Sequence, residues 1–506
     1  MVNRKTLLWA SFFTLIAAGM GFAIRAGLLG DWAQQFGFTK GELGTITGGG
    51  LTGFGVVILL GSLFVDKVGY KPILFIAFVL HIISAVITVA ATPVFEASGK
   101  DAAYWCLFIG MFMFAIANGL CEAVINPLVA TLYPKEKTHY LNILHAGWPG
   151  GLILGATLAY AFAGDKAHVA HMRWEIPMLF FLAPVAIFGL MILKQKFPHS
   201  EAKAAGVDFV TMLKEFAAPV LLLLFLLHAM VGYVELGTDS WIVNILKSVI
   251  PGQEVLLFIY TSAIMFVLRF FAGPIVHRIN PVGLLFISAI LGCLGLYWLS
   301  YAETLTLVIL AATTYGVGKT FLWPTMLGVV GERFPKGGAL TMGTIGGIGM
   351  LSAGLLGGPG IGYKQDYYAS QQLEQEAEPT YKRYVSADEK SFLMFPAVAG
   401  LDGAKVGTLE DDGKELAKRL KVLEDKGEKP EQGKELDNLS KWWKENEKYA
   451  EDDKKPVKDA GIFGGRMALR WTAVVPLAMA VGYLLLILYF RSKGGYKQED
   501  IEGNVE

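Results

Sequence analysis

A carboxylate, Glu122, stands inside the apolar stretch GLCEAVINPLVATLYP, which covers residues 119–134. The preceding residues, 104–118, read YWCLFIGMFMFAIAN and are also apolar. A charge in such a segment costs several kcal/mol unless it is paired, hydrated or neutralised by a proton. The carboxylate is therefore expected to serve a cavity, a partner or a proton.

Ionisable residues interrupt three further apolar segments. They are Arg25 in MGFAIRAGLLG, Glu235 and Asp239 in GYVELGTDSWIVNIL, and Lys319 in TYGVGKTFLWPT. Intramembrane ionisable groups normally face a bundle interior or a water-filled cavity. Charges at similar depth in four helices therefore predict one central polar cavity.

Glu122 and Arg25 are the first candidate pair within this cavity. At 1.5 Å per residue, Arg25 lies about 27 Å from the start of its segment, and Glu122 about 18 Å from the end of its own. A long arginine side chain with modest helix tilt bridges the remaining offset of about 9 Å. We expect the two to pair in at least one conformation, either as a structural pair or as a pair that breaks and re-forms during function.

Other side chains have two interpretations each. His145 in NILHAGW is either a hydrogen-bonded packing residue or a proton or substrate contact, because its pKa suits proton transfer. Arg269 in VLRFFAGP lies near a segment end and is expected to snorkel in a structural role. Aromatic residues either pack or stack on a sugar ring, and the candidates are Tyr233, Trp241 and Trp323.

The composition places the 506-residue chain among membrane proteins. Hydrophobic residues make up 54% of it, and the mean hydropathy is +0.47. The formal net charge of zero gives no indication of nucleic-acid binding, and three cysteines in apolar segments imply neither a disulfide framework nor a metal site. We expect no cofactor.

Windows of about 20 apolar residues predict membrane-spanning helices. Most basic residues of the short loops fall on the side that holds the N-terminus, so both termini are predicted to be cytoplasmic. The twelve predicted spans are 7–29, 43–65, 72–93, 104–132, 141–163, 175–194, 217–236, 254–276, 281–300, 304–330, 338–360 and 467–490.

Residues 361–466 break this pattern because they are strongly charged. The stretches 414–426 and 434–450 have the pattern of amphipathic helices. Since this segment follows an odd number of crossings, it is predicted to be extracytoplasmic, as a solvated cap or lid or as a partner-binding domain.

The chain also shows an internal repeat. Glycine pairs end at Gly151 and Gly347, 196 residues apart, while Glu122 and Lys319 are 197 residues apart. A shared offset is expected of a six-helix unit used twice. The predicted domains are 1–194 (first six-helix bundle), 195–216 (cytoplasmic linker), 217–360 with 467–490 (second six-helix bundle), 361–466 (extracytoplasmic insertion) and 491–506 (cytoplasmic tail).

The loop VDKVGYK resembles a signature of the major facilitator superfamily between its second and third spans. Asp66, Gly69 and Lys71 keep the spacing, although Ser62 stands where the family has its leading glycine. The resemblance implies a gating loop at the cytoplasmic face, where the charges latch helix ends together.

Within that superfamily the chain is similar to the fucose–galactose–gluconate proton symporter group. Glu122 and Asn126 match its Glu-x-x-x-Asn-Pro signature in the fourth span, and Glu235 and Asn244 match its motif in the seventh. The supporting matches are Pro127, Ser240, Val243, Pro324 and Thr325, with Trp323 in place of phenylalanine.

The resemblance implies an all-α membrane protein with twelve transmembrane helices in two pseudo-symmetric bundles, here with a charged helical insertion between helices 11 and 12. Glu122 carries over as the proton site, with Arg25 and His145 as added candidates for coupling. Leu28 stands where the family has a proton-binding aspartate, His145 replaces a glutamine and Lys319 replaces an asparagine. The predicted cavity residues are Glu235, Asp239, Lys319, Asn126, Asn244, Tyr233, Trp241 and Trp323.

The resulting hypothesis is a secondary active transporter, not an enzyme, that imports a sugar or sugar acid with protons through a plasma membrane. If the source is bacterial, this is the inner membrane. Its expected partners are the solute, a proton and the lipid bilayer, and it is expected to be a monomer. Sodium coupling, proton-antiport export and a non-transporting sensor that uses residues 361–466 are the alternatives.

Overall fold

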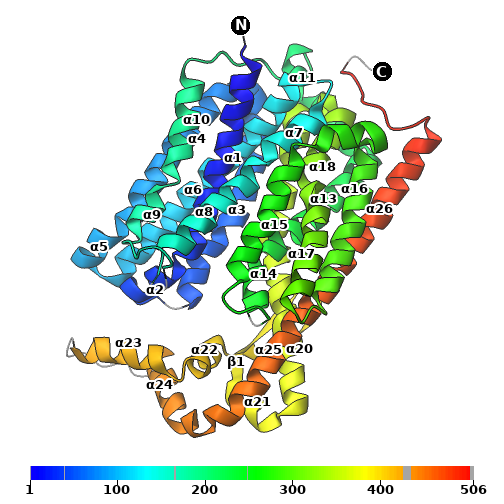
Figure 1. The fold of residues 1–506 in the computed structure, drawn as a ribbon. Coiled ribbons are helices and arrows are strands. Elements are labelled where there is room, and N and C mark those ends of the chain that lie inside the picture. The colour runs from blue at the N-terminus through cyan, green and yellow to red at the C-terminus, as the bar shows by residue number, and fades with distance from the viewer. Residues whose placement is uncertain (1, 39, 165–166, 248, 426–434, 502–506) are drawn as a thin grey trace.

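The computed structural model describes residues 2–38, 40–164, 167–247, 249–425 and 435–501. Two bundles of long helices lie side by side, and a smaller unit hangs from one end of them (Figure 1). The first helix begins and the last helix ends at the opposite end (Figure 1). We call this end the termini face and the other end the insertion face.

The first bundle is built from long helices whose apolar residues make one continuous core. Pro127 lies inside its longest helix, which is tolerated where neighbouring helices cover the freed backbone groups. Its elements are α1 (Arg4–Gly27), α2 (Leu29–Phe36), α3 (Lys40–Val68), α4 (Tyr70–Val89), α5 (Ala91–Ser98), α6 (Lys100–Leu132), α7 (Lys137–His145), α8 (Gly147–Phe162), α9 (Glu175–Leu179) and α10 (Leu182–Leu193).

A short linker with α11 (Glu201–Ala204), α12 (Phe209–Lys214) and η1 (Glu215–Ala217) leads to the second bundle. Two π-helical turns, η2 and η4, lie within its long helices. Its elements are α13 (Pro219–Gly232), η2 (Tyr233–Gly237), α14 (Thr238–Lys247), α15 (Glu254–Arg269), α16 (Ala272–Leu299), α17 (Leu305–Thr320), α18 (Leu322–Arg333), η3 (Pro335–Gly337), α19 (Gly338–Ser352), η4 (Ala353–Gly357) and α26 (Val474–Ser492).

Helices cover all twelve predicted windows, and ten stretches among the described residues are long and apolar enough to cross a membrane. The windows 141–163 and 254–276 are not among the ten. The first is divided between α7 and α8, and the second between α15, which has 16 residues, and the start of α16. α16 itself bends at Asn280, where φ is 55°, so the predicted boundary between two spans lies at this bend.

The smaller unit contains the elements between η4 and α26. These are α20 (Gly358–Glu376), α21 (Glu378–Tyr384), β1 (Val385–Phe392), β2 (Phe395–Leu401), α22 (Gly403–Glu410), α23 (Lys414–Asp425), α24 (Glu435–Asn446), η5 (Glu447–Tyr449) and α25 (Ala450–Thr472). α23 and α24 fall where amphipathic helices were predicted, although residues 426 and 434 of those segments lie outside the described residues. The insertion was predicted to be helical, and it also contains β1 and β2, which pair as an antiparallel hairpin.

The insertion is joined to the membrane bundle by helices rather than by flexible loops. α20 continues the eleventh span and α25 leads directly into the twelfth (Figure 1), so the expected borders at 360 and 467 fall inside helices. The unit also has its own small core, which includes Leu373, Tyr384 and Leu409. Helical attachment couples its position to that of the second bundle.

Glycines set the spacing of equivalent helix pairs in the two bundles. A Cβ on Gly151 of α8 would lie 2.3 Å from the Ile16 carbonyl oxygen of α1, and one on Gly232 of α13 would lie 2.0 Å from the Gly349 carbonyl oxygen of α19. The first span thus packs on the fifth as the seventh packs on the eleventh. Small residues permit this close approach of backbones.

We expect Gly232→Ala to destabilise the protein by about 1–3 kcal/mol, because the added methyl must push two backbones apart. Thermal unfolding of the purified protein in detergent, followed by tryptophan fluorescence, measures the effect. Gly461→Ala is the matched control, since nothing lies within 4 Å of its Cβ position. Equal melting temperatures for the two variants would contradict this packing.

Candidate functional site

Glu122 belongs to a hydrogen-bonded chain at the interface of the two bundles. Its side chain is buried in α6, and its Oε2 accepts a hydrogen bond of 2.6 Å from Asn126 Nδ2. One turn separates the two residues, which places both on one face of the helix. Asn126 Oδ1 in turn accepts from His145 Nε2 at 2.9 Å, at the end of α7.

Arg269 carries this chain into the second bundle. Its Nη1 donates to the His145 carbonyl oxygen at 2.7 Å, and its Nη2 forms a 2.9 Å ion pair with Glu235 Oε1. Its Nε donates to the Thr320 carbonyl oxygen at 2.7 Å. The expectation that Arg269 snorkels was wrong, because the residue is 1% exposed and joins the two bundles.

A second buried ion pair lies within the second bundle. Lys319 of α17 pairs with Asp239 of α14, and its ammonium lies 5.1 Å from the centroid of the Tyr315 ring. Tyr315 Oη donates to the Val234 carbonyl oxygen at 2.7 Å, in the π-helical turn that holds Glu235. Three predicted cavity residues, Glu235, Asp239 and Lys319, are thus brought together.

Arg25 does not pair with Glu122 in this structure, contrary to expectation. Its guanidinium donates to the Gly21 carbonyl oxygen at 3.1 Å and to Ser84 Oγ at 3.0 Å, and it lies 3.9 Å from the centroid of the Phe114 ring. Phe114 and Glu122 are eight residues apart on α6, which is about 12 Å along a helix. Arg25 therefore points into the first bundle, whereas Glu122 faces the interface.

The remaining predicted cavity residues lie at different depths. Trp323 is buried, and Trp241 Nε1 donates to the Gly358 carbonyl oxygen at 2.8 Å. Tyr233 is half-buried and its Oη accepts from Lys364 Nζ at 3.0 Å, where α20 leaves the bundle. Asn244 is exposed on α14 and makes no contact with the network described above. Tyr233 and Trp241 therefore lie on the side of the site that faces the insertion.

Sequence reasoning missed His228, which lies in the apolar run PVLLLLFLLHAMVG. The imidazole is fully buried, its centroid is 4.5 Å from that of Trp323, and neither ring nitrogen has a hydrogen-bond partner among the described residues. Seven residues separate it from Glu235, so the two lie on one side of the seventh span. A lone histidine within an apolar run was the available signal.

The predicted gating loop lies at the termini face. Lys71 Nζ donates to the carbonyl oxygens of Leu193 (2.7 Å) and Gln195 (3.2 Å), which end the first bundle. Gly69 has a φ of 91°, a conformation that favours glycine. A Cβ on Gly338, the first residue of α19, would lie 3.3 Å from Asp66 Oδ2. Asp66 thus faces the second bundle while Lys71 stays within the first.

Hydrogen bonds close the two bundles together at the termini face. Glu332 Oε1 accepts from the Thr138 backbone amide (3.1 Å) and from Thr138 Oγ1 (2.6 Å), which joins α18 to α7. Its Oε2 accepts from Tyr496 Oη at 2.6 Å, and burial raises the pKa of this hydroxyl, so it stays a donor. Lys137 Nζ also donates to the Gly331 carbonyl oxygen at 3.0 Å.

Toward the insertion face the bundles separate along α3. From the termini face to the middle of the helix, α3 packs closely on α19 and then on η4: Cβ atoms on Gly343 and Gly354 would lie 2.2 Å from Ser62 Cβ and 2.6 Å from Thr52 Oγ1. Gly44 and Gly48 continue the same face of α3 by helical spacing. A Cβ on either of them would meet nothing within 4 Å, so this interface opens toward the insertion.

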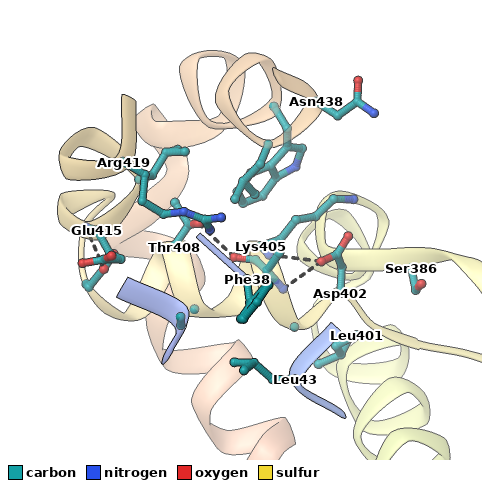
Figure 2. A pocket seen from close by; sticks show the side chains of 18 of the residues that line it. Phe38, Leu43, Ser386, Leu401, Asp402, Lys405, Thr408, Glu415, Arg419 and Asn438 are labelled. Atoms are coloured by element: carbon teal, nitrogen blue, oxygen red, sulfur yellow. Dashed lines mark hydrogen bonds between the residues drawn. The ribbon is translucent and has the colours of Figure 1, made fainter. Parts of the chain in front are cut away.

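A chamber of about 920 Å³ lies between the insertion and the first bundle. Figure 2 shows Phe38 and Leu43 of the first bundle beside Lys405 and Arg419 of the insertion. Part of its polar lining is structural, since Asp402 Oδ1 accepts from the Ala404 and Lys405 backbone amides at the start of α22. The other lining residues of the insertion include Ser386, Asp388, Lys390, Thr408, Glu415 and Trp442.

Comparisons with known proteins give the following matches. A curated relative, the Protein TsgA homolog of Buchnera aphidicola subsp. Schizaphis graminum (strain Sg), is 24% identical over 204 residues, which is 40% of this chain and 49% of that protein. The chain therefore aligns with about half the length of this relative.

Solved structures resemble the fold. FucP in the outward conformation has a TM-score of 0.55 and 19% identity, over 72% of this chain and 92% of its own. The proton:xylose symporter XylE has a TM-score of 0.58 and 15% identity, over 75% and 90%. A bacterial homolog of the human lysosomal transporter Spinster, inward-facing, has a TM-score of 0.62 and 14% identity, over 95% and 96%.

The family model described as Major Facilitator Superfamily matches residues 11–358, more than half of the chain. The helices that cover the twelve predicted windows, the two bundles and the interface between them agree with this match. The chain is therefore a member of the Major Facilitator Superfamily of membrane transporters, with a likeness to the FucP group.

Proposed function

We propose that the protein is a secondary active transporter that imports a sugar or sugar-derived solute by alternating access, with proton symport. The observation that carries this proposal is the buried chain from Glu122 through Asn126, His145 and Arg269 to Glu235, because it joins a carboxylate to the contact between the bundles. The motif matches and the symporters FucP and XylE among the similar folds support it.

Glu122 is the proposed proton site. It has no ion-pair partner within 4 Å among the described residues, so a proton removes the cost of its buried charge. A protonated carboxyl also becomes a donor, which changes the hydrogen bonding of Asn126 and through it that of His145. Because the His145 carbonyl oxygen holds Arg269, protonation is coupled to the contact between the bundles.

The substrate is proposed to bind where the two bundles meet, beside His228, Trp323 and Glu235. The unpartnered imidazole nitrogens suit substrate hydroxyl groups, and the indole face suits a sugar ring. Arg269 and Lys319 each have an acidic partner, which favours a neutral hydroxylated solute over a sugar acid. Arg25 keeps its proposed part in coupling only if another conformation brings it to Glu122.

We expect substrate addition to acidify the lumen of liposomes that contain the wild-type protein, and Glu122→Gln to abolish this signal. A panel of neutral sugars, deoxysugars and sugar acids is added while an internal dye reports pH. Glu303→Gln is the matched control, since its side chain is 72% exposed and far from the interface, and it should transport normally. Full proton uptake by Glu122→Gln would refute the assignment, and alkalinisation would indicate antiport export.

A second candidate function rests on the chamber of about 920 Å³ beneath the insertion. A non-transporting sensor would bind a solute there without moving it. Binding of a panel member to the purified protein, with no flux of solute, proton or sodium in liposomes, would favour the sensor.

We place the insertion outside the cell and both termini in the cytoplasm, because the basic residues near the termini face favour this orientation. We also propose that the protein is a monomer in a plasma membrane.

A further inference from the structure

The turn of the β-hairpin exposes an apolar tip, residues 392–395, with the sequence FLMF. Leu393, Met394 and Phe395 are 67%, 88% and 51% exposed. A cluster of large apolar side chains in water marks a surface that another surface covers. The tip therefore requires a partner in some conformation of the protein.

The hairpin is fixed to the second bundle through α20. Tyr363 Oη donates to the Pro396 carbonyl oxygen at 2.8 Å, and the Tyr363 ring lies 6.1 Å from Phe392 and 5.9 Å from Phe395. Ser370 Oγ donates to the Ala399 carbonyl oxygen at 2.9 Å. Because α20 continues the eleventh span, the hairpin must move with that span.

The tip begins at the insertion end of the interface between the bundles. A Cβ on Gly360 would lie 2.8 Å from the Phe392 ring and 2.9 Å from Tyr233 Oη, so Phe392 lies close to Tyr233, one of the predicted cavity residues. Across from it, Leu43 of α3 lines the same chamber as Asp388 and Lys390 of β1. The hairpin therefore faces the outer end of α3.

We propose that the hairpin tip is an outer gate of the transporter, which closes against Gly44 and Gly48 of α3 when the bundles approach each other at the insertion face. These glycines continue the face of α3 that already packs on α19 and η4, so closure extends an existing interface. Their lack of side chains leaves room for Met394 and its neighbours, whose apolar surface is then removed from water.

The proposal needs only alternating access, so its test requires no known substrate. Met394→Cys is combined with Gly48→Cys in the full chain, with Cys106, Cys121 and Cys293 replaced by serine, and the protein is oxidised in liposomes with copper phenanthroline. A disulfide needs Cα atoms within about 7 Å. We expect the pair to cross-link, and reduction to reverse the cross-link.

Met394→Cys with Gly49→Cys is the matched control. Gly49 is also exposed with nothing within 4 Å of its Cβ position, but it is turned about 100° away from the packed face. No cross-link with Gly48, or equal yields with Gly48 and Gly49, would overturn the gate. Since positions 48, 49 and 394 are open to solvent, the changes there leave the packing unchanged, and the replacement of Cys106, Cys121 and Cys293 is common to both pairs.

Coupling to the opposite face gives a second readout. Adding Glu332→Gln, which removes the charge that closes the termini face, is expected to raise the rate of the Met394–Gly48 cross-link about tenfold. An unchanged rate would show that the tip does not respond to the transport cycle and would overturn its role as a gate. The cross-linking rates do not depend on any solute. If no solute moves protons in the liposome assay, the transport proposal fails, but the cross-linking result still decides whether the tip is a gate.

Discussion

Replacing Arg269 with glutamine will abolish transport and lower the free energy of unfolding by about 3–5 kcal/mol. The substitution leaves Glu235 as an uncompensated buried carboxylate and removes the donor that holds the His145 carbonyl oxygen of the other bundle. Thermal or chemical unfolding in detergent measures the stability, and the liposome assay measures transport. The expected loss is large because both charges of the pair are nearly inaccessible to water, at 1% and 3% side-chain exposure.

A double-mutant cycle separates the ion pair from other effects of the substitution. Glu235→Gln with Arg269→Gln should be more stable than the sum of the single changes predicts, by about 1–3 kcal/mol. Arg173→Gln is the control, since Arg173 also pairs with a glutamate, at 3.0 Å, but is 74% exposed and should change stability by less than about 1 kcal/mol. Additive effects of the two buried changes would show that the pair is not the source of the loss.

Replacing Glu332 with glutamine will shift the protein toward a conformation that is open at the termini face. The carboxylate accepts three hydrogen bonds, two from Thr138 and one from Tyr496, and the amide of glutamine cannot accept all of them. Hydrogen bonds to a charged group contribute about 1.5–3 kcal/mol each. A loss of this size shifts a two-state equilibrium about 10- to 100-fold.

Spin labels on Lys135 and Arg278, exposed residues of different bundles at the termini face, report the separation of the bundles by pulsed electron resonance. We expect Glu332→Gln to lengthen the main distance, or to add a longer component. Glu136→Gln, an exposed acidic residue beside the same loop, is the control and should leave the distances as in the wild type. An unchanged distance distribution in Glu332→Gln would mean that other contacts hold the termini face closed.

The amino-acid sequence predicted the helices well because their signal is local. Stretches of about 20 apolar residues suffice to indicate a span, and helices cover every predicted window. The glycine pairs likewise indicated close packing: Gly151 lies against backbone atoms of α1, and Gly347 lies against the Leu59 side chain and the Gly55 carbonyl oxygen of α3. The predicted borders of the insertion fall inside α20 and α25. The change from apolar to charged residues marks where a helix leaves the membrane, but it does not mark where the helix ends. Neither the charge pattern nor the composition indicated the hairpin.

Which charges meet was decided by the tertiary structure alone. Depth along a helix placed Arg25 near Glu122, but depth does not give the direction in which a side chain points, and Arg25 turns into the first bundle toward Ser84. Arg269 lies near the end of α15, yet neighbouring helices enclose it and bring it to Glu235. His228 was missed for the same reason, since its neighbours Trp323 and Gly349 are far away in the sequence.

By itself, then, the sequence determined the membrane class, the helical spans and the burial of Arg25, Glu122, Glu235 and Lys319, because each depends on the types of neighbouring residues. The choice of partners within that set, the closure at the termini face through Glu332 and the position of the hairpin tip depend on contacts between different elements, from 29 positions apart for Ser370 and Ala399 to 194 for Thr138 and Glu332. Such contacts are fixed by the packing of whole helices, in which about half a turn of rotation moves a side chain from the interface into the bundle.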